Sequence, residues 1–264
     1  MKTRLALCLL AAALAYGATA RAGAATTWFP QEFTCPVCRT KNTFLVVGSY
    51  GSYIYQWPSK FELIFWPLTD SPTVYTCKQC HVSAFMWDFE GLPKEKHEEL
   101  RKRLAGFKLE YARPAAGHDE GADYLRIPST QRLLAAEQTY QVLGRDDDFW
   151  CKFYRALGHH CEAQKQPAPA DAARRKALSI AERLLADPAR ASERKELLFV
   201  TGAMRHFLKD DPGALKDFRE AEGLKYVSRE LGPEKSKNYD EYLSDLLRQY
   251  FELLGAQGGK KPAA

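Results

Sequence analysis

The sequence predicts an α+β protein in which a small β module, rich in aromatic residues and cysteines, precedes an all-α array of helical hairpins. Residues 26–92 hold four of the seven cysteines and 15 of the 32 aromatic residues, and they carry few helix signals. From Pro93 onward, charged residues at i,i+4 spacing and helix-capping residues dominate. Asp187-Pro188 and Asp211-Pro212 are two copies of one helix-start signal, an aspartate cap followed by proline in the first turn. We therefore expect a signal peptide at 1–25, the β module at 26–92, a helix and linker at 93–128, the helical domain at 129–255 and a disordered tail at 256–264.

The N-terminus has the pattern of a secretory signal peptide. Lys2 and Arg4 precede an apolar run, Leu5 to Ala15, and Ala-x-Ala sites follow at residues 18–20 and 22–24. The apolar run is about half of the roughly 20 residues that a membrane-spanning helix needs. No later stretch approaches that length, so we expect a periplasmic or secreted protein without a membrane span after cleavage.

Cleavage changes both the charge and the cysteine count. The chain has 38 basic and 33 acidic residues; loss of Lys2, Arg4 and Arg21 leaves 35 against 33, a net charge of +2. This nearly equal number of basic and acidic residues argues against a nucleic-acid partner. Loss of Cys8 turns seven cysteines into six.

Three short runs in the β module are typical of strands. They are β-branched or aromatic and are bounded by Gly, Pro, Ser or Asp: Thr43–Val47, Phe61–Trp66 and Thr73–Thr76. We expect most of the module's aromatic side chains to form its core.

The strongest chemical signal is a pair of Cys-x-x-Cys turns, Cys35-Pro-Val-Cys38 and Cys77-Lys-Gln-Cys80. Each turn directs two sulfurs to one side of a tight loop, and two turns supply the four thiolates of a structural zinc site. The strand-like residues between them favour a zinc-ribbon-like module. Four cysteine ligands leave no open position for catalysis; His81 could replace one sulfur, but the geometry favours Cys35, Cys38, Cys77 and Cys80.

Two other interpretations of these cysteines remain open. Export would take the chain to an oxidising compartment, where the same four thiols can form disulfides. The Cys35/Cys38 pair also resembles the dithiol of glutaredoxin-like proteins, which gives the alternative function of an envelope thiol-disulfide oxidoreductase. Redox dithiols of that kind open a helix, whereas the residues after Cys38 indicate a turn and then a strand.

Cys151 and Cys161 allow three interpretations. One helix through both would separate them by about 15 Å, too far for a disulfide. If Gly158 ends the helix and turns the chain, a disulfide becomes feasible. The other options are two unpaired packed thiols and a second metal site with His159 and His160.

Helices are expected from Ser129 to Leu143, from Asp146 or Asp147 to about Leu157, at about 171–186, and as a hairpin at about 188–224, with a last helix between Gly232-Pro233 and Gly255.

The hairpin at about 188–224 matches the tetratricopeptide template in part. With Gly202 at the template's glycine, Ala214, Phe218 and Ala221 occupy the small, aromatic and small positions of the second helix. Arg205 departs from the template, which has a large aromatic residue there.

The chain resembles the bacterial family called "domain of unknown function 2225". The resemblance lies in Phe33-Thr-Cys-Pro-Val-Cys38, then Val74-Tyr-Thr-Cys-Lys-Gln-Cys80 with Ala84 after it, and it covers about residues 30–225. It implies a cysteine module followed by a tetratricopeptide-like region, and no activity. Arg39 and His81 stand where the family's turns usually have glycine.

We expect a non-enzymatic exported scaffold that binds a protein or peptide partner and holds a structural zinc ion. The sequence contains no H-E-x-x-H, G-x-S-x-G or Walker motif. Nucleic-acid binding, a common use of zinc ribbons, conflicts with export and with the balanced charge.

Overall fold

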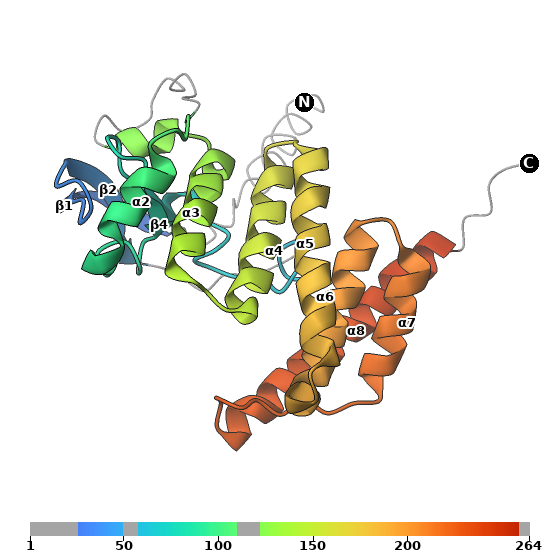
Figure 1. Ribbon diagram of the computed structural model, residues 1–264. Coiled ribbons are helices and arrows are strands. Elements are labelled where there is room, and N and C mark those ends of the chain that lie inside the picture. Colours follow the sequence, from blue (N-terminus) through green and yellow to red (C-terminus); the bar gives the residue numbers. More distant parts are fainter. Residues whose placement is uncertain (1–25, 50–57, 110–121, 259–264) are drawn as a thin grey trace, which may run out of the picture. The chain divides into compact units, whose positions relative to one another are not determined.

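The computed structural model describes residues 26–49, 58–109 and 122–258 (Figure 1). The predicted signal peptide, part of the predicted linker and the last six residues lie outside these ranges. None of the helices in the described ranges combines the length and the apolar character needed to cross a bilayer.

The chain divides into two compact units, Met1–Phe29 with Val46–Ile54 and Pro30–Leu45 with Tyr55–Ala264. In the described part of the first unit, the hydroxyls of Thr27 and Ser49 lie 2.7 Å apart. A Cβ on Gly48 would lie 3.0 Å from the Phe29 ring, so glycine lets that ring lie close against the backbone. The second unit contains the six described cysteines and all the described helices.

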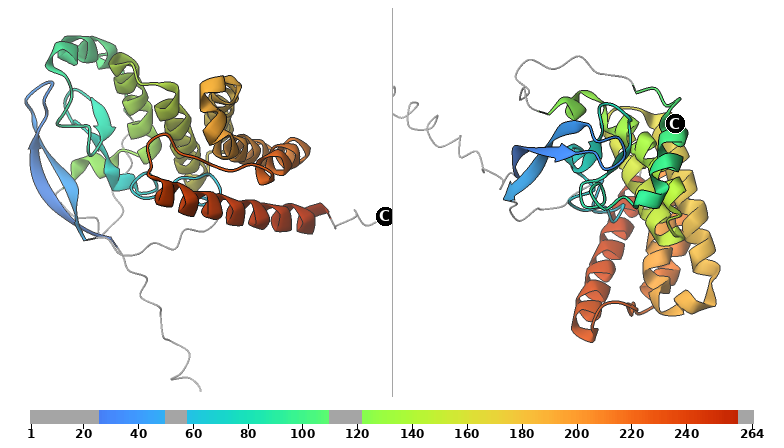
Figure 2. Two further views of the ribbon diagram at one scale, coloured as in Figure 1. Left: turned by 90° about the horizontal axis from the view of Figure 1, so that it is seen from below. Right: turned by 60° about the vertical axis from the view of Figure 1, so that its left-hand side comes forward.

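Two short hairpins form the β structure (Figures 1 and 2). Strands β1 (Thr27–Thr34) and β2 (Lys41–Ser49) make one, and β3 (Val74–Thr76) and β4 (Ser83–Phe85) make the other. The second hairpin is antiparallel, with Tyr75 opposite Ala84. The predicted strands at 43–47 and 73–76 are confirmed, while β1 and β4 were not predicted.

The predicted strand at Phe61–Trp66 is wrong. This segment forms consecutive turns, and Leu63 has a φ of 51°. Its polar groups bind helices instead of a strand: Arg155 donates to the Glu62 carbonyl over 2.9 Å, and the buried Glu62 carboxylate pairs with Arg174 at 2.7 Å. The run is apolar because it is buried against helices.

Aromatic rings fill the core beneath the hairpins, as expected. Phe44 stacks on Tyr75 with ring centroids 4.2 Å apart, and Phe89 and Tyr124 meet Phe44 edge-on. The Tyr75 hydroxyl donates to the Leu45 carbonyl over 2.9 Å, which satisfies its one polar group.

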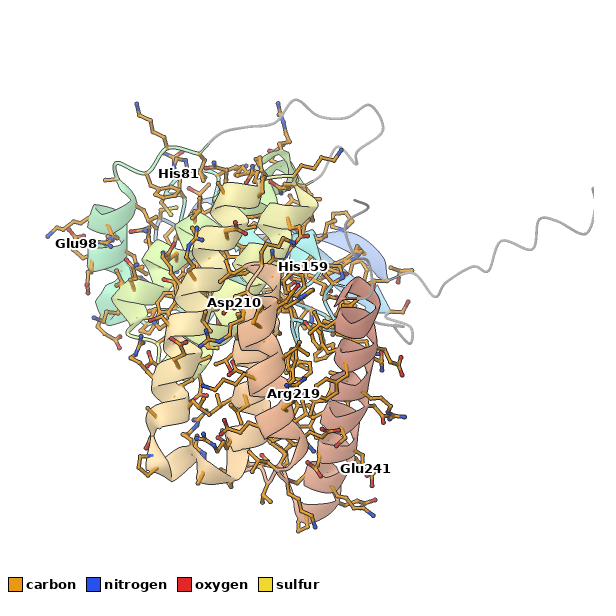
Figure 3. The ribbon with its side chains drawn as sticks, turned by 90° about the vertical axis from the view of Figure 1, so that its right-hand side faces the viewer. His81, Glu98, His159, Asp210, Arg219 and Glu241 are labelled. Carbon is orange, nitrogen blue, oxygen red and sulfur yellow. The ribbon has the colours of Figure 1, made fainter. Side chains whose placement is uncertain are left out.

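Seven α-helices follow among the described residues: α2 (His97–Leu104), α3 (Ser129–Leu143), α4 (Asp147–Ala163), α5 (Pro167–Ala186), α6 (Arg194–Phe207), α7 (Asp211–Glu222) and α8 (Pro233–Gly258). From α4 to α7 each helix packs on the next, and α8 packs on α6 and α7. Figure 3 shows α6, α7 and α8 together, with Asp210 at the start of α7, Arg219 along it and Glu241 on α8.

Several helix ends differ from the expectation. Helix α4 continues through Gly158 to Ala163, where Lys165 with a φ of 57° follows its end. Gly158 serves packing: a Cβ there would lie 3.1 Å from Arg174 Cγ on α5. Asp187 caps a 3-10 turn, Pro188–Glu193, before α6, and Asp210 rather than Asp211 caps α7 by accepting from the Gly213 N–H.

The helix α6–α7 pair is joined by a close approach at Gly202. A Cβ on this glycine would lie 2.4 Å from the Phe218 ring, so the crossing requires glycine. Ala214, Phe218 and Ala221 are fully buried, as the hairpin pattern predicts. Arg205 pairs with Asp217 at 2.9 Å and with Glu182 at 2.6 Å, so ion pairs replace an aromatic contact.

Helix α3 holds the second hairpin through Arg132. This buried guanidinium donates to the carbonyls of Ile127, Ser71 and Val74 over 2.7–2.9 Å. Burial lowers the pKa of Arg132 to about 10. Three carbonyl acceptors compensate for the loss of hydration of this charge.

Candidate metal centre

Both Cys-x-x-Cys turns have the same backbone hydrogen bonds. In the first, the Cys35 N–H donates to the Thr40 carbonyl and the Arg39 N–H to the Cys35 carbonyl, over 2.9 and 3.0 Å. In the second, the Cys77 N–H donates to the Val82 carbonyl and the His81 N–H to the Cys77 carbonyl, also over 2.9 and 3.0 Å. Each turn therefore points its two sulfurs to one side.

Each of the two turns closes through a residue in the left-handed backbone conformation. Arg39 has a φ of 65° and His81 a φ of 60°, a region that favours glycine. These are the two positions where the sequence lacks the glycine that is usual in such turns. The structure accommodates the larger residues without changing the turn.

The four sulfurs Cys35, Cys38, Cys77 and Cys80 all lie within 4.8 Å of one another. Two sulfur pairs cross between the turns, Cys35 to Cys80 at 3.7 Å and Cys38 to Cys77 at 3.5 Å. A tetrahedral ion with metal–sulfur bonds of about 2.3 Å would place its sulfurs about 3.8 Å apart. A disulfide would need about 2.05 Å. The separations therefore match a tetrathiolate metal site, and the four cysteines are free thiols.

The sulfurs also interact electrostatically. The hydrogen bond with Cys77, together with burial, raises the pKa of Cys35 to about 12. Cys77 has a pKa well below its ordinary value because Cys35 and Cys80 donate to it, while the hydrogen bonds with Cys35 and Cys77, together with burial, raise the pKa of Cys80. In this arrangement one thiolate accepts hydrogen bonds from its neighbours. A divalent cation would supply the positive charge that lets the remaining thiols ionise.

Asn42 connects the two turns, a role that the sequence reasoning missed. Its Oδ1 accepts from the Lys78 N–H over 2.9 Å, and its Nδ2 donates to the Thr40 carbonyl over 2.9 Å and lies 3.6 Å from Cys77 Sγ. An N–H near a metal-binding sulfur stabilises its negative charge. The available signal was a short polar residue four positions after Cys38, just before the apolar run Phe44–Val47 of the same strand.

His81 does not point its ring to the sulfurs as a ligand. Its Nδ1 lies 3.1 Å from the Phe107 carbonyl, to which it donates a hydrogen bond. The histidine therefore joins the second turn to the chain beyond α2.

A disulfide between Cys151 and Cys161 does not form. Both are buried free thiols on one continuous helix, α4, and ten residues at about 1.5 Å each separate them by about 15 Å. Burial raises the pKa of Cys151 and raises that of Cys161 to about 11. They are packed thiols, and among the described residues only Cys35, Cys38, Cys77 and Cys80 form a group of three or more metal-ligating side chains.

The histidine pair beside them is also structural. His160 Nε2 donates to the Leu68 carbonyl over 2.9 Å, and its Nδ1 accepts from the Ser129 hydroxyl over 3.1 Å. Ser129 is the first residue of α3 and binds His160 instead of capping its own helix. His159 lies 3.4 Å from the Glu62 carboxylate.

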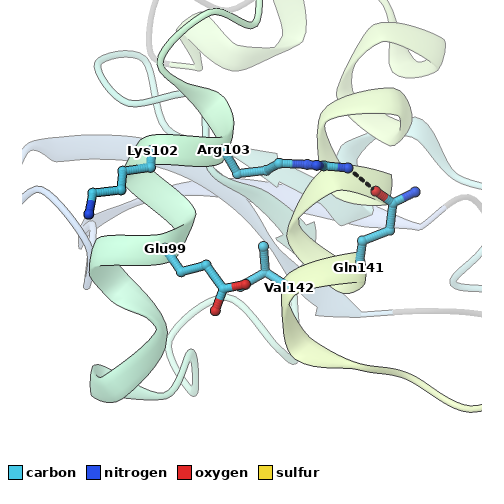
Figure 4. Close-up of a pocket in the computed structure, with 5 residues that line it drawn as sticks. All are labelled: Glu99, Lys102, Arg103, Gln141 and Val142. Atoms are coloured by element: carbon cyan, nitrogen blue, oxygen red, sulfur yellow. Dashed lines mark hydrogen bonds between the residues drawn. The ribbon is translucent and has the colours of Figure 1, made fainter.

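A cavity of about 420 Å³ lies between α2 and α3 (Figure 4). Its lining is mainly charged or amide-bearing: Glu99, Lys102, Arg103, Gln141 and Val142. Arg103 donates to the Gln141 amide across it. The lining thus offers polar groups of both charges and one apolar side chain.

Fold and site together define a class of protein: two cysteine turns on β-hairpins that bring four thiols to one point, followed by a chain of packed helices. No family model matches the chain, and no curated protein or solved structure matches it. The resemblance to the "domain of unknown function 2225" family therefore stays a prediction based on the cysteine spacing.

Proposed function

We propose that this protein is an exported, non-enzymatic protein-interaction scaffold whose zinc-ribbon-like module is held by one structural zinc ion. The observation that supports the proposal most is the spacing of the four cysteine sulfurs, which lie within 4.8 Å of one another on two turns of equal geometry. Zinc is the metal that tetrahedral thiolate sites most commonly bind in structural roles, although such sites also bind iron. With four protein ligands the ion has no position left for substrate.

The interaction role rests on the helices. A series in which each helix packs on the next, with the α6–α7 crossing set by Gly202 and Phe218, is consistent with a tetratricopeptide-like array. Arrays of this kind bind extended proteins or peptides on their surfaces.

The alternative, a thiol-disulfide oxidoreductase, has less support. Cys35 is fully buried, and strand β2 rather than a helix follows Cys38. A catalytic dithiol needs an accessible sulfur near positive potential, such as a helix N-terminus.

Elemental analysis and a thiol count on the natively exported protein test the metal proposal. We expect about one zinc per chain and no disulfide. Cys77→Ser should lose the zinc and much of the stability, whereas Cys161→Ala, a buried cysteine outside the centre, should keep the zinc. Protein without metal and with Cys35 and Cys38 in disulfides would overturn the proposal.

A thiol-exchange assay tests the alternative function. The wild-type protein should not reduce insulin under reducing cycling. Turnover that Cys35→Ser abolishes would instead support the oxidoreductase.

A further inference from the structure

Trp87 is a large apolar side chain held at the surface by a rigid turn. Its side chain is 52% exposed, although it follows the buried strand β4. The N–H groups of Asp88 and Phe89 both donate to the Phe85 carbonyl, over 2.9 and 3.1 Å. The Phe85 N–H in turn donates to the Tyr140 hydroxyl of α3 over 2.8 Å. The position of the indole is thus fixed before any ligand arrives.

Side-chain contacts hold the same turn. The Trp87 ring stacks on Phe85 with centroids 4.8 Å apart and an interplanar angle of 11°. The Asp88 carboxylate accepts from the Tyr140 hydroxyl over 2.8 Å through one oxygen and pairs with Arg145 at 3.1 Å through the other. Both Asp88 oxygens therefore already have partners within the protein.

Two cavities share Trp87, Asp88 and Arg145 in their linings. The first, about 200 Å³, is aromatic and is completed by Leu68, Phe85, Phe149, Lys152 and Phe153. The second, about 270 Å³, is completed by Gly91, Leu92, Pro93 and Leu143. An extended ligand that crosses the indole would have a recess for a side chain on either side of it.

The charge around the aromatic cavity is positive. The Arg145 guanidinium lies 5.2 Å from the centroid of the Phe149 ring and 5.4 Å from that of Tyr140. Lys152 also lines this cavity and is exposed, and within the described ranges it forms no ion pair. Asp88 and Arg145 already pair with each other, so the unpaired charge of the lining is that of Lys152; Arg145 keeps further N–H donors, and the site has few free acceptors. A carboxylate beside an apolar group complements it better than a neutral sugar, whose hydroxyls need both donors and acceptors.

We propose that the cavities beside Trp87 dock an acidic segment of a partner protein, with an aromatic side chain in the Phe149 cavity and a neighbouring carboxylate on Lys152 and Arg145. Tryptophan and arginine are the residues that most often dominate the energy of such interfaces. The inference rests on the proposed scaffold role and gives the partner its chemistry, but it does not depend on the metal.

Isothermal titration calorimetry with blocked hexapeptides tests this docking site on the full mature protein. One peptide contains Asp-Phe-Asp, the second replaces both aspartates by asparagine, and the third replaces phenylalanine by glycine. We expect the first to bind and the other two to bind at least tenfold more weakly. Binding of the first peptide should weaken as salt increases, because it depends on exposed charges.

Variants assign the binding to this surface. Trp87→Ala should weaken binding of the first peptide at least tenfold, and Lys152→Gln should weaken it several-fold and reduce its salt dependence. Leu231→Ala, which truncates an exposed apolar side chain outside both cavities, and Lys235→Gln on α8 should bind like the wild type. Zinc content and the unfolding midpoint of each variant show that the fold is kept.

Three results would overturn the docking site: equal affinity of Trp87→Ala and wild type, no binding of any peptide in the set at millimolar concentration, or a dimer that Trp87→Ala dissociates, which would assign the surface to a second copy. If the peptides do not bind but the protein contains zinc, the docking site is wrong and the proposal of a scaffold held by zinc is unaffected. Absence of zinc with peptide binding intact overturns the metal proposal alone.

Discussion

At the scale of single residues, the structure places non-glycine side chains where backbone geometry favours glycine. Arg39 and His81 occupy equivalent left-handed positions in the two cysteine turns. Such a conformation costs an L-residue about 1–2 kcal/mol. The turns keep this conformation because their N–H groups and the sulfur cluster require it.

Arg39→Gly should therefore stabilise the metal-loaded protein. We expect the free energy of unfolding in urea to rise by about 0.5–1 kcal/mol, because relief of the left-handed strain exceeds the added entropy of glycine in the unfolded chain. Arg101→Gly, the same substitution on the exposed face of α2, should lower it by about 1 kcal/mol. A loss of stability on Arg39→Gly would show that the side chain contributes more than the backbone strain costs.

His160 gives the protein a defined loss of stability in acid. Burial lowers the pKa of His160 to about 4, from an ordinary value of 6.5. The unfolded chain therefore binds a proton more readily than the folded one, and stability is lost as the pH falls from about 6.5 towards 4. The full difference between the two pKa values corresponds to about 3 kcal/mol in the free energy of unfolding. Urea unfolding at pH 7 and pH 4.5 should show a smaller loss for His160→Asn than for wild type; equal losses would contradict this account.

At the scale of secondary-structure elements, one close crossing sets the geometry of α6 and α7. Gly202 has no space for a Cβ beside the Phe218 ring, which itself stacks on Tyr250 of α8 at 4.4 Å. A ring that packs against two helices has little freedom to move away.

Gly202→Ala should consequently destabilise the protein by about 1–3 kcal/mol, the usual cost of overpacking a core. Gly255→Ala is the matched control, because nothing lies within 4 Å of a Cβ there and alanine favours the helix. Thermal unfolding should separate the two variants clearly. If both behave alike, the crossing is looser than the contact distance indicates.

Elements with strong local signals were predictable from the sequence, and elements decided by distant contacts were not. Asp146 caps α4 through the Phe149 N–H, as its position predicts. The run at 61–66 has the composition of a strand, but its backbone binds Arg155 and Tyr250, which lie roughly 90 and 190 residues away. Likewise the four cysteine ligands follow from their spacing, whereas Asn42 and its contact with the second turn depend on the pairing of the turns.

At the scale of the whole molecule, the cysteine module and α3 behave as one structure. Strands β3 and β4 have three residues each, too few for a stable hairpin alone. Arg132 and Tyr140 of α3 bind their backbone, as described above. Loss of the metal should therefore affect a helix that contributes no ligand.

Hydrogen exchange with and without a chelator checks this coupling. We expect metal removal to reduce protection at least tenfold in β3, β4 and the Leu133–Val142 part of α3, with little change in α7, which is remote in the packing series. A uniform loss throughout the chain would mean one global unfolding unit. Unchanged α3 would mean that the module and the helix are independent.

The buried Arg132 constrains how the two regions of the chain can evolve. Its planar guanidinium lies beyond the boundary at residue 128 and donates to three carbonyls that all precede this boundary, and lysine, a point charge, cannot donate in three fixed directions from the same place. A recombination event that joined this cysteine module to another helical domain would leave three buried carbonyls without their donor. The two regions should therefore be transmitted as a single piece, and any descendant that varies residue 132 should also rebuild the turn at Ser71 to Val74.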